Sequence, residues 1–255
     1  MQNRYTCDVG DFAKYGLMRS FHAAGFRTAL AWYLSSDEGH NSDGKHIAYL
    51  GFDEFRRCDP KLYDQLKTMV DGNNRHISAI EGSKILGADT LFHSELLDFN
   101  DLPSLLCKAG KHKREERRKK WLSNCKTETK DAEVAFFDPD NGIAGNKPRP
   151  LASKGPKFLY WSDLDTFIDR EQSLVIYNHA SRNGTVYNQI TSRLSEIKGH
   201  VPYGSNAFAM LWRRYSVRYF LVIPTDDMKS RISSTCDDMI AGPWGQGKFF
   251  ELVKK

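Results

Sequence analysis

The feature that most constrains this chain is an alternation of short apolar runs with helical segments, which continues almost to its last residue. Buried strands are predicted at 28–34, 133–137 and 174–178, and the first of them reads TALAWYL. A helix is predicted from Asp11 to about Ala24, ahead of these strands. Strands that are apolar on both faces and alternate with helices are typical of a mostly parallel sheet with helices on both faces. The sequence therefore predicts an α/β fold.

Further elements extend this pattern toward the end of the chain. Strands are predicted near 90–93, 157–160 and 248–253, and helices at 59–71, 162–169, 185–197 and 226–240. Two apolar runs, 207–213 and 218–223, are close enough to form an antiparallel hairpin. No linker rich in Ser, Gly or Pro divides the chain, so we expect one α/β domain over 1–255 with a basic helical insertion at about 107–130.

Composition excludes several classes of protein. No apolar run approaches the roughly 18 residues that a membrane-spanning helix needs. The first residues also lack the positively charged stretch followed by an apolar stretch that is typical of a signal peptide. Five cysteines are scattered without a CxxC pair, which argues against a zinc ribbon and against a secreted disulfide framework. We therefore expect a cytoplasmic protein without membrane contact and without a structural metal site.

Positive charge is concentrated in one segment. The chain has a net charge of +5, whereas residues 107–130 alone carry +7, so the rest of the chain is slightly acidic. A local excess of this kind indicates contact with a polyanion. We expect an exposed helix that binds nucleic-acid phosphates through Arg114, Arg117, Arg118 and Lys119. The alternative is a solvated helix in which Glu115 pairs with Arg118 and Lys119.

Ionisable residues follow three of the predicted strands. Ligands of parallel α/β sheets bind beyond the carboxyl ends of the strands, so these loops predict a cleft. The residues that follow the three strands are Asp37, Glu38, His40, Asp138, Asp140, Asn141 and His179. Asp138 would lie at a strand tip, where a carboxylate can hold a metal ion, a base amino group or a proton. The alternative for Asp138–Gly142 is a plain turn.

Taken in order, several stretches resemble the RlmJ-type adenine methyltransferases of large-subunit ribosomal RNA. The matching segments are VGDFAKY at 9–15, AWYLSSDEG at 31–39, Gly82-Ser83, FHSELLDFNDLPSLL at 92–106 and Asp138-Pro139-Asp140-Asn141, which stands where the family has Asp-Pro-Pro-Tyr. The resemblance implies a Rossmann-like fold, S-adenosylmethionine as cofactor and RNA modification. It implies catalytic roles for Asp138, Asp140 and Asn141, and cofactor contacts for Asp11, Lys14, Glu38, Ser83 and Glu95, with Glu95 at the ribose.

Two differences from the family pattern concern its chemistry. The loop SSDEGHN is charged and has one glycine where the family has a Gly-rich loop. Asp140-Asn141 provides no aromatic ring to stack on a flipped adenine. A fold can be kept while its chemistry changes.

Three functions therefore remain open. The first is a methyltransferase-like enzyme that acts on RNA or DNA. The second is a metal-dependent nuclease or phosphoesterase, in which Asp37, Glu38, Asp138, Asp140, His40 and His179 would bind Mg²⁺ or act as a base. The third is a non-catalytic accessory protein that binds nucleic acid through the basic helix.

Overall fold

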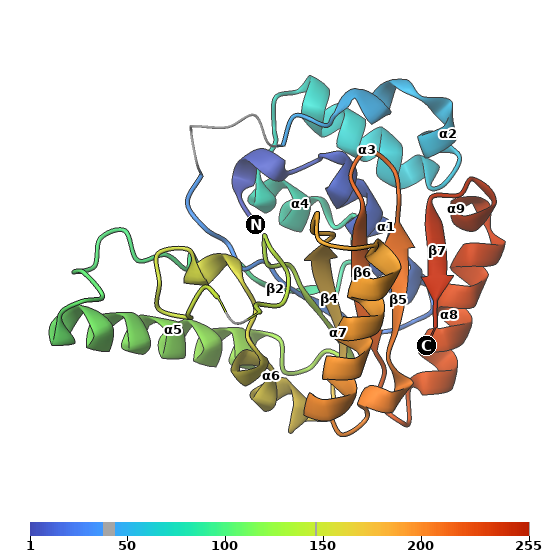
Figure 1. Ribbon diagram of the computed structural model, residues 1–255. Helices are drawn as coiled ribbons and strands as arrows, with labels where there is room; N and C mark the ends of the chain where they lie inside the picture. The colour runs from blue at the N-terminus through green and yellow to red at the C-terminus, as the bar shows by residue number, and fades with distance from the viewer. Residues whose placement is uncertain (38–43, 146, 255) are drawn as a thin grey trace.

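A seven-stranded mixed sheet forms the centre of the computed structural model, which describes residues 1–37, 44–145 and 147–254 (Figure 1). The strand order is β2-β1-β3-β4-β6-β5-β7. The parallel half consists of β1 (Thr28–Ala31), β2 (Leu91–His93), β3 (Val134–Phe137) and β4 (Ser173–His179). The predicted α/β, Rossmann-like fold is confirmed.

The second half of the sheet is antiparallel. The predicted hairpin is present as β5 (Phe208–Trp212) and β6 (Arg218–Ile223), and β6 pairs with β4. The last strand, β7 (Phe250–Val253), pairs with β5. Because β6 runs against β4, the first residue of β6 lies beside the last residue of β4, in the register His179↔Arg218. The carboxyl ends of the parallel strands and the start of β6 therefore share one edge of the sheet.

Helices cover both faces of the sheet (Figure 1). The first face is covered by α1 (Val9–Ala23), α2 (Asp53–Arg56), α3 (Pro60–Asp71), α4 (Ile77–Ser83), α8 (Lys229–Ala241) and α9 (Pro243–Gln246). The second face is covered by α5 (Lys108–Glu128), α6 (Trp161–Ile168) and α7 (Val186–His200). Short 3-10 turns occupy Asn3–Tyr5, Ala48–Gly51, Gly155–Lys157 and Gly204–Asn206.

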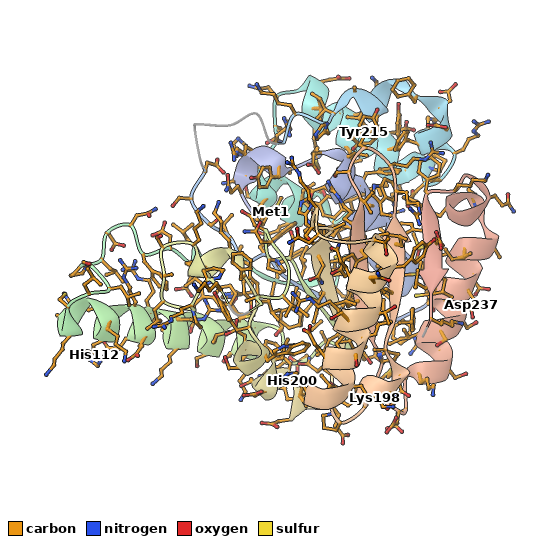
Figure 2. All side chains as sticks on the ribbon, in the orientation of Figure 1. Met1, His112, Lys198, His200, Tyr215 and Asp237 are labelled. Atoms are coloured by element: carbon orange, nitrogen blue, oxygen red, sulfur yellow. The ribbon has the colours of Figure 1, made fainter. Side chains whose placement is uncertain are left out.

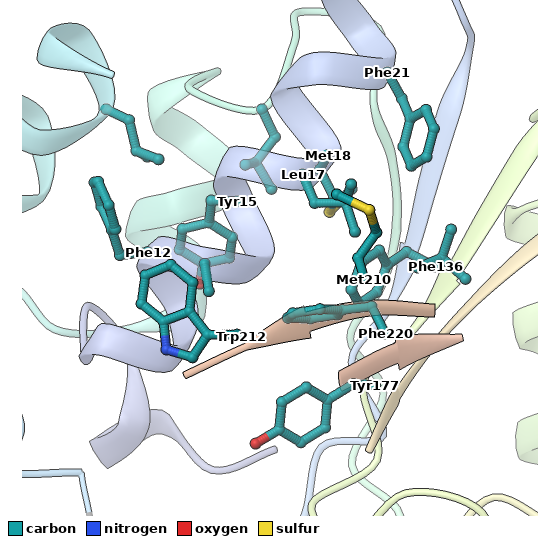
Figure 3. Close-up of a cluster of buried hydrophobic side chains, with 14 of the residues drawn as sticks. Phe12, Tyr15, Leu17, Met18, Phe21, Phe136, Tyr177, Met210, Trp212 and Phe220 are labelled. Atoms are coloured by element: carbon teal, nitrogen blue, oxygen red, sulfur yellow. The ribbon is translucent and has the colours of Figure 1, made fainter. Parts of the chain in front are cut away.

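The strands supply side chains to two separate cores. In β3, Val134 and Phe136 point into the core of the first face, whereas Ala135 and Phe137 point into the core of the second. Figure 3 shows the first core, where Phe12 and Trp212 lie among other aromatic side chains. Burying an aromatic side chain of this size stabilises the fold by about 1.5–3 kcal/mol. The apolar runs of β1, β3, β4, β5 and β6 are continuous because these inner strands are buried on both faces.

Capping chemistry explains the starts of α1 and α3, and the first of them corrects a predicted boundary. The carboxylate of Asp8 accepts hydrogen bonds from the backbone N–H groups of Gly10 at 2.7 Å and Asp11 at 3.0 Å, so α1 begins at Val9 and not at Asp11. This capping arrangement leaves the Asp11 side chain available for other contacts. The start of α3 is as predicted, with Asp59 as the N-cap and Pro60 as the first helical residue.

One predicted strand is absent from the described part of the chain. Residues 157–160 form only an isolated bridge, between Ile143 and Leu159. Leu159 bridges to Ile143 beyond the end of β3, away from the open edges of the sheet at β2 and β7, so the segment does not extend the sheet. The short helices α2, α4 and α9 were not predicted, because segments of four to seven residues carry little periodicity.

The basic segment is helical, as predicted, and forms most of α5. This helix extends outward from the lower left of the molecule in Figure 1. Its second half is anchored, since Trp121 and Cys125 are buried in the second core. Among the residues that the structure describes, no helix combines the length and the apolar character that a membrane crossing requires.

Candidate active site

A cavity of about 550 Å³ opens at the carboxyl edge of the parallel strands. Its walls come from the first turn of α1, the residues after β3, the end of β4 and the start of β6. The side chains that carry its chemistry are Asp11, Lys14, Asp138, Asp140, Tyr177 and Arg218. This position matches the rule that ligands of α/β sheets bind beyond the carboxyl ends of the strands, close to the point where the strand order reverses between β1 and β3.

Lys14 lies between two carboxylates at the floor of the cavity. Its ammonium group pairs with Asp11 at 2.8 Å and donates a second hydrogen bond to Asp138. Burial alone would lower the pKa of Lys14, but the two carboxylates outweigh it and raise the pKa above its usual value. Burial raises the pKa of Asp138, and Lys14 limits that rise. The site therefore holds a cation and a carboxylate in contact and almost out of solvent.

Asp11 is fixed in place by its own set of donors. The hydroxyl of Tyr15 donates to its carboxylate at 2.8 Å, and the backbone N–H of Cys7 donates at 3.0 Å. Together with Lys14, these contacts satisfy a carboxylate that is only 2% exposed. Asp11 therefore positions Lys14 toward Asp138.

Asp140 has a different electrostatic environment. The ammonium group of Met1 pairs with it at 2.8 Å, and Lys157 lies 3.7 Å away. Burial would raise the pKa of Asp140, but the Met1 ammonium group and Lys157 outweigh it and lower the pKa. The same ammonium group donates to the carbonyl oxygen of Tyr33 at 2.9 Å, next to the end of β1. Met1 is labelled near the middle of the molecule in Figure 2.

Arg218 forms part of the opposite wall. It is 5% exposed, and its guanidinium group lies 5.9 Å from the ring centre of Tyr177 and donates to the hydroxyl of Ser216. Within the described ranges its Nε has no hydrogen-bond partner. A side chain at position 10 would overlap the guanidinium group, because a Cβ built there lies 1.3 Å from Nη1. Gly10 therefore permits the close approach of a buried arginine to α1.

The structure brings together most of the residues expected at the catalytic site. Asp138, Asp140 and Asn141 line the cavity together with Asp11 and Lys14. The backbone N–H of Asn141 donates to the carbonyl oxygen of Lys157 at 3.0 Å, which fixes the turn after Asp138. Glu38, expected at the cofactor, lies outside the described residues.

Two of the expected cofactor residues lie elsewhere. Ser83 is the last residue of α4, where its hydroxyl donates to the carbonyl oxygen of Ile80 at 2.7 Å, and it does not line the cavity. Glu95 lines a second cavity, of about 520 Å³, beyond the end of β2. Its carboxylate accepts a hydrogen bond from Asn124 at 2.6 Å. The two residues were expected in one cleft because they match one family motif in order. Glu95 does lie at the same carboxyl edge as Asp138, but β2 is the outermost strand and lies two positions from β3, so Glu95 lines a different cavity.

The expected phosphate contacts on α5 need a correction as well. Arg114 is 8% exposed and Arg118 is 6% exposed, so their guanidinium groups face the protein. Arg118 pairs with the buried Asp163, and Arg117 binds both carboxylate oxygens of Asp101. Of the four expected residues, only Lys119 is exposed. Arg114 and Arg118 face the protein because α5 packs against the sheet. An arginine can bury its aliphatic carbons while its guanidinium group is paired.

The residues expected to bind Mg²⁺ do not form one group. Asp37 is exposed and accepts a hydrogen bond from the backbone N–H of Arg4 at 3.5 Å, whereas His179 lines the cavity. Glu38 and His40 lie outside the described residues. Across 1–37, 44–145 and 147–254, no three His, Cys, Asp or Glu side chains are grouped closely enough to hold a metal ion.

Arg218, Tyr177, Lys154 and Lys157 are among the cavity residues that were not predicted. Arg218 begins the apolar run RYFLVI, and Tyr177 lies within the run SLVIYNH. A charged first residue on an apolar strand was the available signal for Arg218. This signal alone could not place Arg218 at the cavity. The first residue of β6 reaches the carboxyl edge of the parallel strands only because β6 runs antiparallel to β4.

Comparisons of this chain with protein-family models and with curated proteins gave no match. The interpretation of the cavity therefore depends on its own geometry, charge and position in the fold.

Proposed function

We propose that this protein is a nucleic-acid-modifying enzyme that transfers a methyl group from S-adenosylmethionine to an amino group of a base in RNA or DNA. The observation that carries the proposal is the position of Asp138. It follows β3 directly, lines the main cavity and is held by Lys14 in a nearly dry environment. A fixed carboxylate in such a place can accept hydrogen bonds from a reacting amino group.

The cavity suits S-adenosylmethionine in size and in charge. Ligand cavities of about 300–1,000 Å³ are usual for molecules of this class, and this one measures about 550 Å³. S-adenosylmethionine carries a positive sulfonium group and a zwitterionic amino acid, so it needs both anionic and cationic partners. The cavity holds both signs of charge: Asp11 pairs with Lys14, Asp140 pairs with the Met1 ammonium group, and Arg218 provides a buried cation whose Nε has no partner among the described residues.

The chain's own residues would orient and activate the substrate. The cofactor supplies the electrophilic methyl group. Asp138 would accept hydrogen bonds from the base amino group, which increases the electron density on its nitrogen and fixes its direction. Tyr177, whose hydroxyl pKa is raised by burial, would remain neutral and offer an aromatic ring at the wall of the cavity. Correct orientation of two reactants can account for a large part of the rate, because it replaces an encounter in solution.

Cations at the cavity support a polyanionic substrate. Lys154 and Lys157 line it together with Arg218. Lysine and arginine that neutralise phosphates supply much of the affinity of proteins for nucleic acid. A base attached to a phosphate backbone is therefore a better match than a neutral small molecule.

The metal-dependent alternative fits the same residues less well. Lys14 already pairs with both Asp11 and Asp138, and the ammonium group of Met1 pairs with Asp140. Mg²⁺ prefers carboxylate oxygens with several bound waters, so it would have to displace these cations first. The carboxylates of this cavity are therefore better matched to ammonium groups than to a divalent ion.

Calorimetric titration with S-adenosylmethionine and S-adenosylhomocysteine tests the proposal, together with transfer of labelled methyl groups to RNA and DNA. We expect binding of both compounds and methyl transfer to one nucleic acid. Asp138→Asn should retain binding but reduce transfer by about 10²-fold or more, the usual contribution of a positioned acid–base group. Asp237→Asn, an exposed carboxylate on α8, is the matched control and should behave as the unmodified protein.

Three results would contradict the proposal. Absence of binding to either compound would exclude the methyltransferase. Mg²⁺-dependent cleavage of nucleic acid would favour the nuclease alternative. Nucleic-acid binding that is unaffected by Asp138→Asn, without any methyl transfer, would favour the non-catalytic accessory protein.

A further inference from the structure

A second positively charged segment adjoins the candidate active site, and we call it the basic loop, residues 147–157. It carries Lys147, Arg149, Lys154 and Lys157, and no Asp or Glu occurs anywhere between Asn141 and Ser162. Lys147, Arg149 and Lys154 are exposed. The basic loop therefore presents cations that no acidic neighbour along the chain offsets.

The basic loop is held in a defined position by buried groups. Arg114 of α5 donates to the carbonyl oxygen of Leu151 at 3.0 Å, and its other nitrogens donate to that of Pro103. The hydroxyl of Tyr160 donates to the carbonyl oxygen of Pro148 at 3.0 Å. Three prolines further restrict the backbone of the segment, at 148, 150 and 156. A loop that is already ordered loses little conformational entropy when it binds a ligand.

One end of the basic loop lies at the candidate active site. Lys154 and Lys157 line the main cavity, and Lys157 lies 3.7 Å from Asp140. The other end carries the exposed side chains of Lys147 and Arg149. Cations are therefore present both inside the cavity and on the surface of the same ordered segment.

Part of the charge of α5 is used internally or offset by acidic neighbours, although Lys113, Lys119 and Lys120 of this helix are also exposed. Arg117 is paired with Asp101, Lys111 lies 3.9 Å from Glu115, and His112 lies 3.2 Å from Glu116. Figure 2 places His112 on the outer part of this helix. Exposed pairs of this type stabilise a helix only slightly, but they reduce the positive field that a phosphate would meet.

We propose that the basic loop, and not α5, binds the backbone phosphates of a nucleic-acid strand whose target base enters the main cavity. The entry of that base rests on the function proposed above. The phosphate contact itself depends only on the charge, exposure and fixed position of the loop. Such contacts hold a strand in register without reading its sequence.

Fluorescence anisotropy with a fluorescein-labelled single-stranded RNA of 16 nucleotides, between 50 and 200 mM KCl and without cofactor, tests this inference. The variant Lys147→Gln/Arg149→Gln is compared with the matched variant Lys111→Gln/Lys113→Gln, which removes the same charge from exposed positions of α5. Each lost phosphate contact reduces the slope of log affinity against log salt by about 0.7 for a single strand. We expect a reduction of about 1.4 in slope and roughly fivefold or more in affinity for the loop variant, and little change for the α5 variant.

The possible results separate this inference from the proposed function. Loop-dependent RNA binding without methyl transfer would support the inference and contradict the methyltransferase. Methyl transfer by the unmodified protein, together with an unchanged salt slope in the loop variant, would support the methyltransferase and contradict the inference about the basic loop. Equal losses in the two variants, or no binding of the RNA by the unmodified protein, would overturn the inference. Circular dichroism on both variants checks that these surface changes leave the fold intact.

Discussion

Lys14 and Asp138 form an ion pair that joins α1 to the carboxyl end of β3, although 124 sequence positions separate them. Their side chains are 3% and 4% exposed. Charged groups are costly to bury unless they are paired and hydrogen-bonded. This contact therefore connects the first helix to the centre of the sheet at the place where the candidate chemistry lies.

Replacing Lys14 by methionine should destabilise the protein by about 3–5 kcal/mol, because a buried carboxylate then loses its cation. The loss should depend on pH. Burial already raises the pKa of Asp138, and removal of Lys14 raises it further. When the pKa of a carboxyl group is higher in the folded state than in the unfolded state, the folded state binds its proton more tightly. This stabilisation is complete below the unfolded pKa of about 3.9, and it is lost as the pH rises through the folded pKa.

Urea unfolding of Lys14→Met at pH 5 and pH 8 measures this effect. The difference in unfolding free energy from the unmodified protein should be larger at pH 8. Lys229→Met removes an exposed lysine of α8 and should change stability by less than about 0.5 kcal/mol at either pH. A small, pH-independent loss for Lys14→Met would show that the pair does not stabilise the fold.

Gly10→Ala tests the contact between α1 and Arg218. Alanine favours a helix over glycine by about 1 kcal/mol, but here its Cβ would overlap the buried guanidinium group. We expect the variant to be destabilised in the unmodified background and neutral or stabilised when Arg218 is also replaced by alanine. A double-mutant cycle by urea unfolding should give a coupling of about 1 kcal/mol or more, since the two groups are in direct contact. Additive effects would mean that Arg218 moves aside without cost.

The fold was predictable from the sequence to a large degree, for a simple physical reason. Strands such as Val134–Phe137 are buried on both faces, so their apolar runs are continuous and easily recognised. The position of Asp138 followed from the same pattern, because a residue directly after a parallel strand lies at the carboxyl edge. The hairpin was predictable, but the antiparallel pairing of β6 with β4 did not follow from any local pattern, and the presence of Arg218 in the cavity depends on it.

The basic helix shows why other parts could not be predicted. Arg114, Arg118, Trp121 and Cys125 are spaced three or four residues apart, so they form one buried face of α5. Two of these four residues are charged, and the face therefore lacks the apolar periodicity that indicates burial. In the sequence, these arginines cannot be distinguished from the exposed lysines beside them. Only the partners Asp163 and Leu151, far along the chain, identify which cations are internal.

Two neighbouring residues of α5 offer a direct test of this distinction. Arg118→Met should destabilise the protein by about 3–5 kcal/mol, because Asp163 is left buried without its cation. Asp163 also accepts hydrogen bonds from the hydroxyl of Tyr33 at 3.3 Å and from the backbone N–H of Tyr160 at 3.0 Å, so loss of its cation affects the start of α6 and the segment that follows β1.

Lys119→Met is the matched control, because it removes the same formal charge from the next, exposed position and should change stability by less than about 0.5 kcal/mol. Urea unfolding of the two variants at pH 7 provides the comparison, and the double variant Arg118→Met/Asp163→Leu should recover part of the loss, since it removes the unpaired carboxylate as well. Equal, small effects of Arg118→Met and Lys119→Met would show that Arg118 is solvated in solution. That result would return Arg118 to the set of residues available to nucleic-acid phosphates.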